Sequence, residues 1–487
     1  MSKKLIDSIK MKQNKKFTEN MGYAYISANS FLVDLFAQVG SMRYREDEIP
    51  QMVINALSED ELLTTKLAFY ARDIRAGLGE RKIARAIFQT LAEFRPEIMK
   101  KNLKYIAEFG RYDDLLCLLD SQLKDDVVLI IKNQLEKDLK DLKDGKSISL
   151  LGKWLPSINT SSKETRDLAK ILINELEMDN KTYRKMLSEL RSYLNVLEVR
   201  MSNSDYDYIR YNEVPSNAMN KYNNAFYRND STRFSAYLRS LINNETTINA
   251  KTLFPYDITY KLLYGNLSDS EKIVFEQQWK NLPNYVSGEN SMLVIADVSG
   301  SMHGKPMATS VGLAIYFAER NKGVFHNKFM TFSSEPELVE IHGNSLQEKI
   351  ISVSREKWEM STNLQGAFDL ILSTAIENNL KQDDLPKTLL VISDMEIDRC
   401  SDVDDWGFYD YMKSKYERNG YNIPTVVFWN VNARHSTFHA SFNNEGVQLA
   451  SGQSPSVFST LVAGEKLSPY KYMVKVLSSE RYDCITI

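Results

Sequence analysis

The sequence has few cysteines, no long apolar run and little net charge. Its three cysteines, Cys117, Cys400 and Cys484, are odd in number and far apart, and no CxxC pair occurs. This pattern favours a reducing compartment and argues against a structural zinc site. No apolar run reaches the roughly 18 residues of a membrane-spanning helix, and the basic start has no apolar segment typical of a signal peptide. We therefore expect a soluble, cytoplasmic protein without membrane partners.

The balance of charge differs between the two halves of the chain. The net charge of the 487 residues is −3, which argues against a protein that is basic throughout. Residues 1–250 nevertheless carry four more basic than acidic residues, whereas residues 251–487 carry seven more acidic than basic ones. An excess of this size supports a polyanionic partner only if folding gathers the cations on one surface.

The N-terminal half has the periodicity of helices. Residues 1–24 are interpreted as a polar tail. Over 25–285, stretches such as "DELLTTKLAFYARDI" (60–74) and "GERKIARAIFQTLAEF" (79–94) repeat apolar residues at three- and four-residue spacing. Successive helices on short connections predict stacked pairs, which form an α-solenoid.

The pattern changes near residue 290, where strand-like runs begin to alternate with helical ones. This alternation predicts a doubly wound, Rossmann-like domain over 290–465, with a mostly parallel sheet. Only the strands at 327–333 and 337–341 are joined closely enough to form a hairpin. We expect residues 466–487 to pack back as a helix and a short strand. The predicted fold class is therefore α plus α/β.

The stretch "VIADVSGSM" (294–302) ends a buried strand on Asp297 and two spaced hydroxyls, Ser299 and Ser301. A phosphate-binding loop is one interpretation, but the glycine–lysine spacing is one residue too short and a proline replaces the hydroxyl that would hold magnesium. A metal site fits better, because alternate residues of an extended loop share a side. The carboxyl ends of parallel strands are also where ligands gather.

Two further oxygen ligands are available at predicted strand ends or loops. Thr362 stands just before a predicted helix. Asp394 ends the continuous, mostly apolar stretch "KTLLVISD" (387–394), which is therefore predicted to be a central strand. Hard oxygen ligands with few charges suit Mg²⁺ or Mn²⁺. The order of these five residues resembles the metal-ion-dependent adhesion site of von Willebrand factor A domains: Asp297, Ser299, Ser301, Thr362 and Asp394. The resemblance implies direct ligation by the hydroxyls and an open position for an acidic group of a partner.

Four stretches of the helical half resemble the TROVE module of Ro-type proteins, and more closely an uncharacterised family that joins such a module to an A domain. They are "YARDIRAGLGERKIARAIFQTL" (70–91), "FGRYDDLLCLL" (109–119), "KWLPS" (153–157) and "VPSNAMNKYNNAF" (214–226). The resemblance covers about residues 25–465. It implies a HEAT-like ring or arc of helices that binds structured small RNA outside and single-stranded ends in its hole, with the A domain closing the ring.

The residues themselves give mixed support for RNA. Binding needs cations to offset phosphate charge and, for single strands, aromatic platforms. Tyrosines at 206, 208, 211 and 222 are candidate platforms, whereas Trp154 is better interpreted as a core anchor. Asp73 and Glu80 are candidate ion-pair partners for the nearby arginines. The candidate RNA-binding cations are Arg72, Arg75, Arg81, Lys82, Arg85, Arg111, Lys153, Lys221 and Arg228.

The leading hypothesis is a non-enzymatic RNA-binding protein, of the ribonucleoprotein kind, with no DNA partner expected. Its Mg²⁺-dependent adhesion site would engage an acidic partner group. The alternative is a Mg²⁺-dependent protein–protein scaffold without RNA. A metal-dependent nuclease is disfavoured, because neither a general base nor the carboxylates of a second metal are evident. His435 and His439 are spaced for zinc on a helix but are interpreted as loop residues, and His303 is a candidate neighbour of an acidic ligand.

Overall fold

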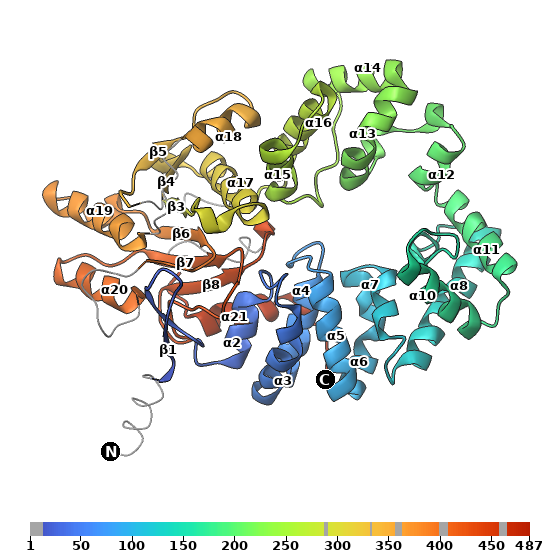
Figure 1. The fold of residues 1–487 in the computed structure, drawn as a ribbon, viewed down its shortest axis with the longest axis horizontal. Coiled ribbons are helices and arrows are strands. Elements are labelled where there is room, and N and C mark those ends of the chain that lie inside the picture. The colour runs from blue at the N-terminus through green and yellow to red at the C-terminus, as the bar shows by residue number, and fades with distance from the viewer. Residues whose placement is uncertain (1–12, 287–290, 332–333, 356–362, 399–407, 457–464) are drawn as a thin grey trace.

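The chain folds into a helical N-terminal part followed by a C-terminal mixed sheet of six strands, mostly parallel (Figure 1). The computed structural model describes residues 13–286, 291–331, 334–355, 363–398, 408–456 and 465–487. Among these residues no helix combines the length and the apolar character needed to cross a membrane. The architecture agrees with the predicted class, α plus α/β.

The helices leave the sheet domain, curve round and return to it (Figure 1). In chain order they are α2 (Phe31–Gln38), α3 (Ile49–Glu59), α4 (Glu61–Arg72), α5 (Lys82–Phe94), α6 (Pro96–Asn102), α7 (Ile106–Phe109), α8 (Lys124–Lys143), α9 (Leu151–Trp154), α10 (Lys163–Glu175), α11 (Asn180–Tyr193), α12 (Leu197–Ser202), α13 (Ser216–Asn229), α14 (Ser231–Ile242), α15 (Pro255–Tyr264) and α16 (Asp269–Lys280). A 3-10 helix, η3 (Tyr112–Leu118), lies between α7 and α8.

Local sequence explains where several of these helices begin. The side chain of Asp60 accepts a hydrogen bond from the backbone of Leu63 and caps α4. Pro96 is the first residue of α6, where its missing N–H leaves no backbone donor unpaired. α5 buries one face, including Ile87 and Phe88, as its apolar spacing predicts.

The sheet has the strand order β5-β4-β3-β6-β7-β8, and only β4 and β5 pair antiparallel. The hairpin expected near 327–341 is this pair. The strands are β3 (Met292–Ala296), β4 (Lys328–Thr331), β5 (Leu338–Glu340), β6 (Thr388–Ser393), β7 (Thr425–Asn430) and β8 (Val447–Ser451), and the helices are α17 (Lys305–Arg320), α18 (Leu346–Arg355), α19 (Leu364–Glu377) and α20 (Phe408–Arg418). β3 and β6 are parallel neighbours and buried throughout, so both end at the same edge.

The sheet domain joins the two ends of the helical arc. At one end α15 packs on α17, and Thr259 donates a 2.7 Å hydrogen bond to Ala308 O. At the other end the backbone N–H of Gly40, just after α2, bonds Ser451 of β8 at 3.0 Å. The arc also touches itself directly, because the Phe254 ring lies against Gly79.

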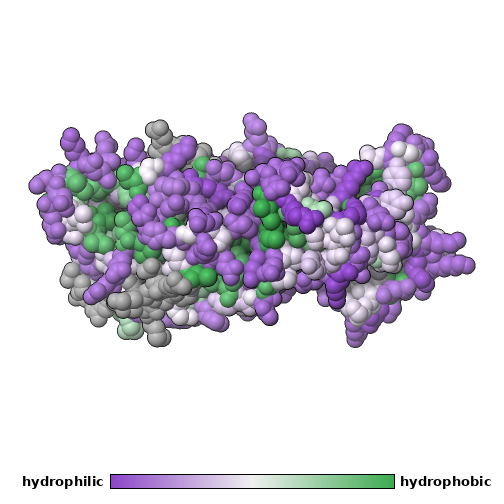
Figure 2. Space-filling view, turned by 90° about the horizontal axis from the view of Figure 1, so that it is seen from above, coloured by the Kyte–Doolittle hydropathy of each residue, from purple (hydrophilic) through white to green (hydrophobic). Residues whose placement is uncertain are grey.

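The guanidinium of Arg43 lies 5.7 Å from the centre of the Tyr256 ring, beside the contact of Phe254 with Gly79. The helices and the sheet domain therefore form a closed ring. The ring is flattened when seen from its edge, and the face in that view is mainly hydrophilic (Figure 2).

The two ends of the described chain depart from the predictions. Residues 15–25 form an antiparallel hairpin, β1 (Lys15–Phe17) and β2 (Tyr23–Tyr25), where a polar tail was expected. Strands of three residues are too short to show a period, so no sequence pattern predicts them. Near the C-terminus, α21 (Pro469–Leu477) is followed by a 3-10 turn in place of the predicted strand.

Candidate functional site

A cavity of about 1660 Å³ lies inside the ring of helices. This volume exceeds the range of ordinary small-molecule pockets. Its walls come from the end of α4 round to the start of α15, so all four stretches that resemble the TROVE module contribute lining residues. Four acidic residues line it, against nine basic ones: Arg72, Arg81, Arg111, Lys153, Arg191, Arg200, Arg210, Lys221 and Arg233.

Five of the nine candidate RNA-binding cations lie in this lining: Arg72, Arg81, Arg111, Lys153 and Lys221. The other four lie elsewhere. Arg75 donates to Glu108 O, Lys82 is exposed near Glu46, and Arg228 bonds the backbone of its own helix. Arg85 is held by Asp113 and Asp114. Arg191, Arg200 and Arg210 were missed, because nothing in the sequence shows that α11, α12 and the loop after α12 face the same space.

The arginines of the α4–α5 and η3 walls share two aspartates. Arg72 donates a 2.7 Å hydrogen bond to Asp114, and Arg85 donates to the other oxygen of that carboxylate. Asp113 pairs with Arg81 and Arg111. Arg72, Arg81 and Arg111 line the cavity and Arg85 does not, but all four share these two anions, so the cluster carries a net positive charge.

The partners proposed for these arginines from sequence were wrong. Asp73 pairs with Arg481 near the C-terminus at 2.9 Å, and Glu80 pairs with Arg43 at 2.6 Å. Both acids are therefore used to join distant segments of the chain. They do not neutralise the cavity.

Aromatic rings stand among the cations of the cavity. Trp154 is half-buried and lines the cavity, with the Arg111 guanidinium 4.1 Å and the Lys153 ammonium 5.3 Å from its ring centre. Its place is the cavity wall, where a core anchor was expected. Tyr208 and Tyr222 also line the cavity, and Tyr208 is 71% exposed. Tyr211, by contrast, is buried in the fold.

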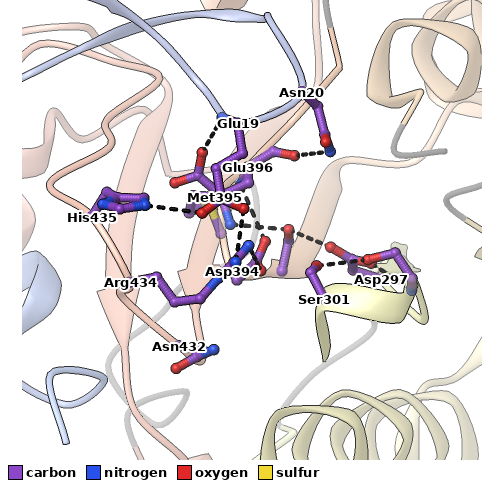
Figure 3. Close-up of polar contacts among 12 residues, drawn as sticks. Glu19, Asn20, Asp297, Ser301, Asp394, Met395, Glu396, Asn432, Arg434 and His435 are labelled. Atoms are coloured by element: carbon purple, nitrogen blue, oxygen red, sulfur yellow. Dashed lines mark hydrogen bonds and ion pairs between the residues drawn. The ribbon is translucent and has the colours of Figure 1, made fainter. Parts of the chain in front are cut away.

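A second candidate site lies at the strand edge where β3 and β6 end. Asp297 follows β3 and is fully buried, and Asp394 follows β6 with 1% exposure. Ser301 lies between these two carboxylates (Figure 3), and its hydroxyl is 3.1 Å from that of Ser299. Four of the five predicted ligands are thus brought together. Thr362 lies outside the described residues.

The charge on Asp297 is not balanced by a basic side chain among the described residues. Its carboxylate accepts hydrogen bonds from the Ser299 N–H at 2.9 Å and the Ser393 hydroxyl at 2.7 Å. Burial, with the Asp394 charge in second place, raises the pKa of Asp297. Two buried carboxylates beside two hydroxyls are a donor set that suits a hard divalent cation. Among the described residues, however, no three His, Cys, Asp or Glu side chains cluster as metal ligands.

Asp394 has a cation of its own. Arg434, from the loop after β7, donates a 2.9 Å hydrogen bond to Asp394 and pairs with Glu19 at 2.7 Å (Figure 3). The backbone N–H of Glu396 bonds the second Asp394 oxygen at 3.2 Å. Sequence reasoning missed Arg434, because it stands 40 positions from Asp394 and 415 from Glu19.

The histidines near this edge have separate partners. His439 is buried against Met395 O, and burial lowers its pKa to about 4. His435 bonds Glu19 at 2.9 Å. The two rings thus contact different groups. His303 lies beside the Tyr264 ring, 5.7 Å between centres.

This chain is similar to an uncharacterised viral protein over nearly its whole length. The sequence is 30% identical to "Uncharacterized protein L728" of Acanthamoeba polyphaga mimivirus, over 95% of this chain and 87% of the viral protein. A crystal structure of the Deinococcus radiodurans RO (RSR) protein aligns with 95% of this chain and 96% of its own, at 12% identity and a TM-score of 0.35. That likeness is too distant to support an inference about fold or function.

Two family models match adjoining parts of the sequence, and they meet close to residue 291, just before β3. "Domain of unknown function (DUF7788)" matches residues 291–481. "Domain of unknown function (DUF2828)" matches residues 18–133 and 119–292, more than half of the chain. The protein therefore belongs to the DUF2828 family.

Proposed function

We propose that this protein binds RNA, with a single-stranded segment inside the cavity of the helical ring. The observation that carries the proposal is the lining of that cavity, in which basic residues outnumber acidic ones nine to four. Cations offset phosphate charge, and the aromatic rings of Trp154, Tyr208 and Tyr222 can stack bases without sequence preference. The role proposed is binding, not catalysis.

Two lysines are the best placed to contact phosphate. Lys153 and Lys221 form no ion pair with any described residue, and each lies over an aromatic ring of the cavity wall. Arg72 and Arg111, which also line the cavity, are held by aspartates, so they contribute a fixed positive field.

The test is a titration of a fluorescent structured RNA with a single-stranded tail, at several salt concentrations, with and without EDTA. We expect salt-dependent, EDTA-insensitive binding. Lys153→Gln with Lys221→Gln should reduce the salt slope by about 1.4, because each phosphate contact with a single strand contributes roughly 0.7 to that slope. The matched control is Lys82→Gln with Arg228→Gln, two cations outside the cavity. No binding at low salt would contradict the proposal and favour the protein–protein scaffold.

We also propose that the strand edge binds Mg²⁺ or Mn²⁺ and offers it to an acidic group of a partner. The supporting observation is the buried Asp297, without a basic partner among the described residues and close to two hydroxyls. Calorimetric titration with Mn²⁺ should show one site in the native protein and none in Asp297→Ala. Asp167→Ala, at an exposed ion pair of the helical part, serves as the control. Equal binding by both variants would refute the site.

A further inference from the structure

The hairpin of β1 and β2 lies directly on the loop that carries Asp394. Thr18 donates a 2.7 Å hydrogen bond to Ile397 O, and Asn20 donates one of the same length to Glu396 O. Gly22 packs so closely on Ile397 O that a Cβ atom would collide with it. Tyr25 exchanges two backbone hydrogen bonds with Phe438, at 2.8 and 3.0 Å. The hairpin is thus fixed to both loops that border the strand edge.

The turn of this hairpin delivers a carboxylate to the edge. Glu19 pairs with Arg434 at 2.7 Å and with His435 at 2.9 Å, while Arg434 also bonds Asp394 (Figure 3). The backbone N–H of Glu19 bonds Glu396 at 2.7 Å and fixes the turn. An arginine fork that faces two carboxylates is a geometry suited to recognising acidic groups.

We propose that the hairpin is the resident occupant of an acidic-peptide surface, where Glu19 stands in the place of a partner's carboxylate on Arg434 and His435. An acidic peptide segment of a partner binds here only by displacing Glu19. The inference rests on the proposed adhesion site, because the same surface borders Asp297 and Asp394.

Attachment to the same chain explains why the internal acid prevails. A tethered group competes at a high effective concentration, in the millimolar range for short linkers. The displaced contact is nevertheless weak by itself, because the Glu19 side chain is 41% and that of Arg434 32% exposed. An acidic peptide with several carboxylates can therefore compete.

The experiment uses the full chain and a fluorescein-labelled pentaglutamate peptide in the presence of Mg²⁺. Glu19→Gln should bind the peptide roughly tenfold more tightly than the native protein, because an internal competitor is removed. Its amide exchange over residues 14–25 should also become faster. Arg434→Gln should show the faster exchange without the gain in affinity. The matched control, Glu445→Gln, removes an exposed carboxylate paired with Lys471 and should change neither quantity.

The outcomes separate the two proposals. If Mn²⁺ binds normally but Glu19→Gln takes up pentaglutamate no better than the native chain, the hairpin is not an occupant and this inference is overturned, while the metal site stands. If Mn²⁺ binds neither protein, the metal site fails and the inference fails with it. RNA titration is unaffected in both cases, because the cavity lies in the helical ring.

Discussion

Asp34 is a carboxyl group whose charge the fold disfavours. It lies in the first turn of α2, is 9% exposed and accepts a 2.6 Å hydrogen bond from the Ala28 N–H. Burial is the main cause that raises its pKa to about 7. Because the folded-state pKa is above the unfolded one, the stability linked to this group is present below about pH 4 and is lost as pH rises toward 7.

We therefore predict that Asp34→Asn stabilises the protein at pH 8, by on the order of 4 kcal/mol, and changes little at pH 4. The amide keeps an acceptor oxygen for Ala28 but carries no charge. Chemical denaturation of both proteins at the two pH values measures the difference. Asp167→Asn, at an exposed ion pair, should show no such dependence. Equal stability of Asp34→Asn and the native protein at pH 8 would contradict the prediction.

Trp154 combines an aromatic face with neighbouring cations at the cavity wall. We predict that Trp154→Ala weakens the binding of a single-stranded RNA tail by about 1–3 kcal/mol, which is the contribution of one stacked base. The salt slope should stay unchanged, because no phosphate contact is lost. Fluorescence titration of the native protein, Trp154→Ala and the conservative Trp154→Phe tests this. A large loss in the phenylalanine variant would speak against stacking.

At the scale of elements, α13 and α14 stand apart from the rest of the fold. Their buried residues Met219, Phe226 and Phe234 belong to a small core of their own, whereas a single core extends through the sheet and the earlier helices. A small core buries less apolar surface, so its opening costs less free energy.

We predict that amides of α13 and α14 exchange faster than those of α17 and β6 under native conditions. Hydrogen exchange read out by mass spectrometry measures this without any substitution. The result would locate the part of the ring that opens most readily. Uniform protection round the ring would show that the two cores unfold as one.

For the whole molecule, the closure of the ring depends on a polar contact between distant segments. Arg43 donates to Glu80 at 2.6 and 3.1 Å and also bonds Gln453, while its guanidinium faces Tyr256. Burial raises the pKa of Glu80, opposed by the Arg43 charge. Glu80 therefore depends on Arg43 to remain charged in the interior.

We predict that Arg43→Met destabilises the protein by about 3–5 kcal/mol, because it leaves a buried carboxylate unpaired. Arg43→Met with Glu80→Met should recover much of the loss, since the uncompensated charge is removed as well. Thermal unfolding compares both variants with Arg210→Met, which breaks an exposed pair with Glu213. If Arg43→Met were as stable as Arg210→Met, the contact between Arg43 and Glu80 would not be needed for closure of the ring.

The sequence by itself determined most helices and strands, and the position of two carboxylates at strand ends. Helical spacing placed α4 and α5, and apolar runs that end on Asp297 and Asp394 placed two carboxylates at one edge, because parallel neighbours in a sheet share their carboxyl ends. Short elements without a period, such as the β1–β2 hairpin, were out of reach of such patterns.

Only the tertiary structure decided which charges meet. Asp73 and Glu80 were expected to neutralise nearby arginines, yet they pair with Arg481 and Arg43, from distant segments. Glu19 and Arg434 are also far apart in the sequence and are brought together by the fold. The same holds for the cations of the cavity. An ion pair depends on a distance of a few ångströms, and that distance is set by how the ring closes. No local pattern along the chain encodes it.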